Sequence, residues 1–125
     1  MPRRHRHLAA AALPVSVFFV SWASLQPSLA PPSEGGADKG LHVLCFAVFG
    51  AMAALAFNRR LLPVAAAGLL AVGAGIEIAQ HFVPGREGSV GDWLADAIGL
   101  VIGIAALELV RRRLGPGSRS VAPEP

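Results

Sequence analysis

Four long apolar stretches constrain this chain more than any other feature of its sequence. They occupy residues 8–25, 41–57, 61–83 and 93–110, and 54% of the 125 residues are hydrophobic. Each stretch is close to the roughly 20 residues that an α-helix needs to cross the hydrocarbon core of a bilayer. None shows the alternation of apolar and polar residues that is typical of a membrane-spanning strand. The sequence therefore predicts an all-α integral membrane protein, a bundle of four transmembrane helices.

The segments outside the apolar stretches have the composition of chain ends and connections. Residues 26–36 and 84–91 are rich in Pro, Gly and Ser, and residues 58–60 form a short basic turn. The last residues are again rich in Gly, Pro and Ser, which is typical of disorder. We predict a basic N-terminus (residues 1–7), one membrane domain (residues 8–113) and a disordered C-terminal tail (residues 114–125).

The distribution of Lys and Arg predicts the orientation of the bundle. Only Lys39 and Arg86, of the 11 Lys and Arg residues, fall on one side of a four-span topology. Because cytoplasmic loops carry the excess of positive charge, we expect both termini to be cytoplasmic and the protein to span the plasma membrane. The residues on the cytoplasmic side are Arg3, Arg4, Arg6, Arg59, Arg60, Arg111, Arg112, Arg113 and Arg119.

The first stretch also resembles a secretory signal peptide. It follows a basic segment and precedes Ser28-Leu29-Ala30, which has the small residues of a cleavage site. The apolar run is longer than that of most signal peptides, and Pro31 follows the bond that would be cut. We expect an uncleaved first helix, with cleavage as the open alternative.

Polar and charged residues recur at the outer ends of the later stretches. A charge at the centre of a bilayer costs about 2.5–3.5 kcal/mol, so such residues are usually retained for a function. Spacings of three or four place the residues of each helix on one face. We therefore expect one polar pocket in the outer leaflet. Its residues are Asp38, Lys39 and His42, then Glu77 and Gln80, then Arg86, Asp92 and Asp96.

Two of these residues are candidates for catalysis. Glu77 lies deepest, and in a partly dehydrated pocket it could act as a general acid or base. Asp38 lies four residues before His42 and could orient the imidazole to form an acid/base pair. Whether the protein is an enzyme stays open at this point.

The other polar residues are candidates for ligand binding. Arg86 and Lys39 lie at the level of the lipid headgroups and suit a phosphate or a carboxylate, which Arg can bind with two N–H groups. The predicted partner is a membrane lipid or a lipid-linked cell-envelope precursor. The ligand-binding candidates are Asp38, Lys39, Gln80, Arg86, Asp92 and Asp96.

Three spaced patterns resemble the signature of the VanZ-like family of membrane proteins. They are Asp38-Lys39-x-x-His42-x-x-x-Phe46, Glu77-x-x-Gln80-x-Phe82-x-Pro84-x-Arg86 and Ser89-x-x-Asp92-x-x-x-Asp96-x-x-Gly99. The family pattern usually has Asn at the position of Asp96. The resemblance implies a small multi-helix membrane protein and a link to resistance to the glycopeptide teicoplanin, but no particular reaction.

Two classes of function remain open. One is a non-catalytic protein that binds an envelope lipid or precursor, and the other is a membrane-embedded acid/base enzyme that acts on a lipid-linked substrate. Binding is favoured because Ser89 has no evident base and Cys45 lies in an apolar run. A proton-coupled transporter is disfavoured because Glu108 is the only ionisable residue in the cytoplasmic half of the spans. Four helices would also need a partner copy, in a homo-oligomer, to enclose a transport path. Glu108 itself is expected to pair with Arg111 or Arg112.

Metal and nucleic-acid binding receive little support from the sequence. The basic residues occur in short clusters without interleaved aromatic residues, so we expect no nucleic-acid partner. No standard zinc motif has the spacing of the available ligands, so we predict no metal and no cofactor. Those available ligands are His42, Glu77, His81, Asp92 and Asp96.

Overall fold

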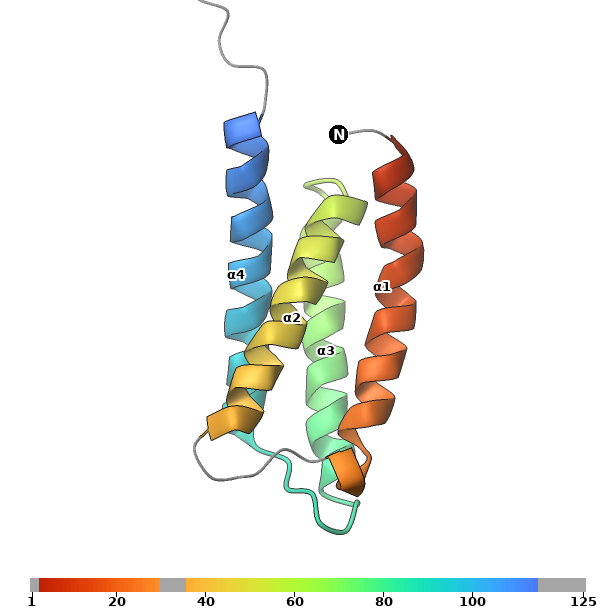
Figure 1. Ribbon diagram of the computed structural model, residues 1–125, viewed down its shortest axis with the longest axis vertical. Helices are drawn as coiled ribbons and strands as arrows, with labels where there is room; N and C mark the ends of the chain where they lie inside the picture. Colours follow the sequence, from red (N-terminus) through yellow and green to blue (C-terminus); the bar gives the residue numbers. More distant parts are fainter. Residues whose placement is uncertain (1–2, 30–35, 115–125) are drawn as a thin grey trace, which may run out of the picture.

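The computed structural model describes residues 3–29 and 36–114, and this part of the chain forms four long helices without a strand. Each helix is long and apolar enough to cross a membrane. Figure 1 shows the helices side by side, with the chain reversing direction at each connection. The predicted all-α bundle of four membrane-spanning helices is confirmed. The elements are α1 (Arg3–Ser24), η1 (Pro27–Leu29), α2 (Ala37–Ala56), α3 (Leu62–Gln80) and α4 (Val90–Leu114).

The helices and the apolar stretches end at different residues. α1 begins at Arg3 rather than at residue 8, and α4 covers Val90–Leu114 rather than residues 93–110. Hydropathy identifies only the part of each helix that suits lipid. Polar residues with good helix propensity, such as the arginines at the start of α1 and the end of α4, continue the helix beyond that part. α3 is shorter than predicted: it ends at Gln80 rather than at residue 83, and a turn follows before Pro84. Of the predicted disordered tail, Leu114 is helical and the rest lies outside the described residues.

α2 and α4 form the closest pair of helices in the bundle. A Cβ atom on Gly99 would collide with the backbone of Val43, and one on Gly103 would collide with the backbone of Ala47. Gly50 of α2 likewise faces the carbonyl of Leu100. Small residues let membrane helices approach in this way, because there is no hydrophobic force between helices in lipid. These glycines therefore fix the position of α4 against α2.

The apolar core lies between the same helices and α3. Phe46 and Phe49 of α2 are buried with their rings edge to face, 5.4 Å between centroids. Leu69 of α3 and Leu100 of α4 pack in the same cluster, and α1 adds Leu13. Most other apolar side chains of the helices point outward, which suits a protein whose outer surface faces lipid.

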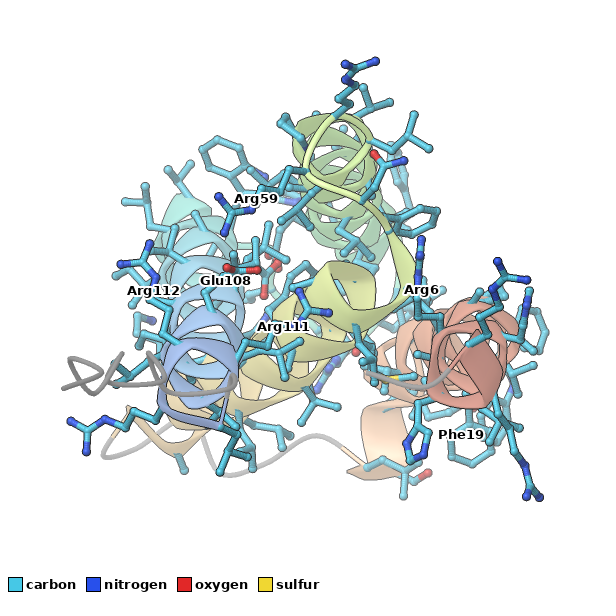
Figure 2. The ribbon with its side chains drawn as sticks, turned by 90° about the horizontal axis from the view of Figure 1, so that it is seen from above. Arg6, Phe19, Arg59, Glu108, Arg111 and Arg112 are labelled. Carbon is cyan, nitrogen blue, oxygen red and sulfur yellow. The ribbon has the colours of Figure 1, made fainter. Side chains whose placement is uncertain are left out.

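The two ends of the bundle differ in charge. Figure 2 looks onto the end that holds the start of α1, the α2–α3 turn and the end of α4, which we call the arginine end. Here Oε1 of Glu108 lies 2.9 Å from an Nη atom of Arg111, and Oε2 of Glu108 lies 3.2 Å from an Nη atom of Arg59. The predicted pair of Glu108 with Arg111 is confirmed, and Arg59 of the neighbouring turn is its second partner. The opposite end, which we call the site end, carries the polar residues His42, Glu77 and Asp96, which the sequence predicts to share a pocket.

Candidate functional site

Three buried residues from three helices meet near the site end. Nδ1 of His42 in α2 lies 2.8 Å from Oδ1 of Asp96 in α4 and 3.9 Å from Oε1 of Glu77 in α3. The exposed fractions of His42, Glu77 and Asp96 are 8%, 7% and 0%. We call this group the buried triad. The structure thus brings together the two predicted acid/base residues and one predicted ligand-binding residue.

Glycines make this meeting possible. Gly73 lies one turn before Glu77 on the same face of α3, and a Cβ atom there would lie 2.5 Å from Oδ2 of Asp96. The same atom would lie 3.2 Å from the ring of Phe46. Together with the close approach at Gly99, the missing side chain at Gly73 allows three helices to converge on the Asp96 carboxylate.

The loop after α3 holds Glu77 in place. The backbone N–H of Ser89 donates a hydrogen bond of 2.7 Å to Oε2 of Glu77. Gly88 packs against the Glu77 carbonyl, where a Cβ atom would collide with it. Within the described part of the chain, Oε1 of Glu77 and Oδ2 of Asp96 have no hydrogen-bond partner. Among the described residues, each carboxylate of the triad therefore has one hydrogen-bonded oxygen and one oxygen without a hydrogen bond.

The partner of His42 differs from the predicted one. The sequence suggested that Asp38 orients the imidazole, whereas the structure pairs Nδ1 of His42 with Asp96. The reason is the glycine contact between α2 and α4, which carries the Asp96 side chain to the ring. Lys39, a predicted ligand-binding residue, forms an ion pair of 3.2 Å with the buried Asp92.

Arg86 and Gln80 join the site to α1. An Nη atom of Arg86 and Nε2 of Gln80 both donate hydrogen bonds to the backbone carbonyl of Ser24, the last residue of α1. Nε of Arg86 is buried and has no hydrogen-bond partner among the described residues. Arg86 is therefore held in position by a bond that uses only part of its guanidinium.

A groove of about 300 Å³ opens between α1, α2 and α3 at this end of the bundle. Most of its walls are apolar, and its polar side chains come from Asp38, His42, Arg86 and Ser24. We call it the α1–α2 groove. The apolar residues that line it are Phe19, Val20, Ala23, Leu29, Leu41, Cys45, Phe46 and Ile76.

Two groups of side chains have the donor atoms of a metal site. In the buried triad, and also in Asp38, His42 and Asp92, the donor atoms lie within 4.8 Å of one another. His81 is in neither group. It faces the backbone instead, with Nδ1 3.0 Å from the carbonyl of Glu77.

A comparison with protein families matches most of the chain. The family model described as VanZ/LLP1 matches residues 6–111, which include all the residues of the site. The chain belongs to the VanZ/LLP1 family. Searches of curated proteins and of solved structures found no match. This VanZ-family chain is thus a multi-pass membrane protein with four spanning helices.

Several contacts of the VanZ-family site could not be read from the sequence. Ser24 and Ser89 act through backbone atoms, which any residue possesses, and Gly73 acts through its missing side chain. The sequence feature that comes closest to predicting them is the excess of glycine and alanine in the apolar stretches. It indicates that the helices pack closely, but it does not identify which helices or residues are in contact.

Proposed function

We propose that this VanZ-family protein binds a cell-envelope lipid or lipid-linked precursor in the α1–α2 groove. The observation that carries the proposal is the make-up of the groove: apolar walls on the helices, with His42 and Arg86 among its few polar side chains. An amphiphile has the same division between an acyl or prenyl chain and a polar headgroup. Ligand sites in general combine apolar walls with a few placed polar groups.

Arg86 is the residue best placed to bind an anionic headgroup. Its bond to Ser24 uses part of the guanidinium, while Nε remains without a partner within residues 3–29 and 36–114. A guanidinium binds phosphate and carboxylate through paired N–H groups. Lys39 is less suitable, because its ammonium is already paired with Asp92.

The proposed location is the outer leaflet of the plasma membrane. The arginine end gathers Arg6, Arg59, Arg111 and Arg112 around a hollow, and Figure 2 shows this end. Positive charge favours the cytoplasmic side, so the groove at the site end faces outward. There, retention of a precursor lowers the amount that a glycopeptide of the teicoplanin type can bind.

A second candidate function is catalysis on the bound lipid. The observation in its favour is the buried triad, in which a histidine, oriented by Asp96, lies close to a second carboxylate, Glu77. His42 also lines the groove, so its ring can reach a bound headgroup. Such a pair could activate a water molecule by general base catalysis.

The proposal is tested by mass spectrometry of lipids that co-purify with the protein. The wild type should retain a defined envelope lipid or precursor, and Arg86→Ala should lose most of it. Arg60→Ala is the matched control, because Arg60 is an exposed arginine at the other end of the bundle. Equal lipid content in all three proteins would show that the groove does not select a headgroup.

One further variant separates binding from catalysis. Glu77→Gln keeps the shape of the side chain and removes its acid/base chemistry. If the protein only binds, Glu77→Gln should retain lipid and most of the resistance phenotype. If the protein is an enzyme, the variant should retain lipid and lose the phenotype together with turnover.

A further inference from the structure

We propose that the buried triad of His42, Glu77 and Asp96 binds one divalent transition-metal ion, Zn²⁺ or Mn²⁺. The inference goes beyond the proposed lipid binding and does not depend on it. It reverses the expectation of no metal, which was based on ligand spacings that fit no standard zinc motif.

Two carboxylate oxygens of the buried triad lack a hydrogen bond from the described residues. Oε1 of Glu77 and Oδ2 of Asp96 are buried, and neither accepts a hydrogen bond from the described residues. The side chains of the two residues are only 9% and 1% exposed. Buried polar atoms are almost always paired, and an unpaired one costs about 1–3 kcal/mol, more for a charged group. A metal ion at the triad would give these carboxylates the missing partner.

The donor atoms of the triad lie close enough together to share one ion. Nδ1 of His42 lies 2.8 Å from an oxygen of Asp96 and 3.9 Å from an oxygen of Glu77. Ligand atoms about 2.1 Å from a shared ion lie about 3.0–3.4 Å apart in octahedral or tetrahedral sites. The two distances, to Oδ1 of Asp96 and to Oε1 of Glu77, bracket this range, and Oδ2 of Asp96 is the second oxygen of the same carboxylate. Small side-chain movements would therefore complete the site. A coordinating imidazole nitrogen must be unprotonated, so a neutral His42 would bind the ion through Nδ1 with its proton on Nε2. A doubly protonated His42 would first release one proton to solvent.

The charge of the ligand set also suits a divalent ion. With both carboxyl groups ionised and the imidazole neutral, as metal coordination requires, the triad carries a charge of −2 inside an apolar part of the bundle. Burial of unpaired charge is strongly unfavourable, and one divalent ion neutralises the group. Imidazole favours Zn²⁺ and related metals over Ca²⁺ and Mg²⁺, and carboxylates also suit Mn²⁺.

The surroundings also fit a metal site. The Ser89 N–H orients the Glu77 carboxylate through its other oxygen, and such outer hydrogen bonds usually position metal ligands. His42 lines the α1–α2 groove, and Glu77 lines a second hollow of about 370 Å³ beside Trp93. Two residues of the triad therefore border hollows of the described structure from which an ion could approach.

The test is the metal content of the full-length protein in lipid nanodiscs. The protein is stripped with a chelator, incubated with ZnCl₂ or MnCl₂, desalted and measured by inductively coupled plasma mass spectrometry. We expect about one ion per chain, together with a rise in Tm on metal addition. Folded protein without bound metal and without a shift in Tm would overturn the proposal.

Paired variants locate the ion. Glu77→Gln and Asp96→Asn preserve side-chain shape and should each raise the Kd at least tenfold. Glu87→Gln and Glu108→Gln remove carboxylates outside the triad and should bind like the wild type. Equal binding by all four variants would mean adsorption to surface carboxylates and would overturn the site.

A spectroscopic measurement on the wild type covers the case in which the triad variants do not fold. Bound Mn²⁺ should show the electron spin echo modulation of one directly coordinated imidazole nitrogen. Mn²⁺ bound without nitrogen coupling would also contradict the assignment.

Discussion

Nδ1 of His42 lies 2.8 Å from Oδ1 of Asp96, which is 54 residues away in the chain. The pair joins α2 to α4 within the region where glycines bring their backbones together. The polar site and the helix packing are therefore coupled: a change in the distance between α2 and α4 must also change the triad.

The first prediction concerns the glycines of the α2–α4 contact. Gly99→Ala and Gly103→Ala should each destabilise the protein by about 1–3 kcal/mol, because overpacking forces backbones apart. The measurement is unfolding in mixed micelles of rising SDS content, followed by circular dichroism.

Gly75→Ala is the matched control, since a Cβ atom there meets nothing within 4 Å. It should change the free energy of unfolding by less than about 1 kcal/mol, the scale of the difference in helix propensity. Equal effects at all three positions would mean that α2 and α4 are not in close contact.

The fold followed from the sequence more completely than the site did. Apolar length and the short polar connections predict four helices, and helical spacing gathers the polar residues at one end. The partner of His42 depends on how α4 is rotated against α2. That rotation is set by contacts such as Gly99 with Val43, which span distant parts of the chain. Asp38 lies four residues from His42 and was the only partner visible locally.

The second prediction concerns the space beside Asp96. Gly73→Ala should displace the Asp96 carboxylate, because the added methyl group would lie 2.5 Å from Oδ2. Zn²⁺ affinity in nanodiscs should fall at least tenfold. Gly68→Ala, on the same helix with open space around it, should bind as the wild type does. Unchanged affinity in Gly73→Ala would place the ion away from Asp96.

The third prediction uses the only cysteine of the chain as a reporter. Cys45 lines the α1–α2 groove and is partly buried. Added envelope lipid should slow the labelling of Cys45 by a small maleimide severalfold in the wild type and in Arg60→Ala. In Arg86→Ala the lipid should have little effect. If the lipid slows labelling equally in Arg86→Ala, Arg86 does not bind the headgroup.

The fourth prediction concerns orientation. Because the arginine end should face the cytoplasm, a green fluorescent protein fused to either terminus should fluoresce. Alkaline phosphatase fused at the same positions should stay inactive, since it requires export. Active phosphatase at the N-terminus would contradict the outer-leaflet position of the groove.

Photocrosslinking tests lipid binding in the α1–α2 groove most directly. A lipid-linked envelope precursor with a diazirine in its chain would be incorporated into nanodiscs with the protein, and the adducts would be mapped by peptide mass spectrometry. Binding in the groove predicts adducts concentrated on Phe19, Leu41 and Cys45, and strongly reduced in Arg86→Ala. Adducts spread evenly over outward-facing residues such as Val64 and Val101, and unchanged in Arg86→Ala, would contradict it.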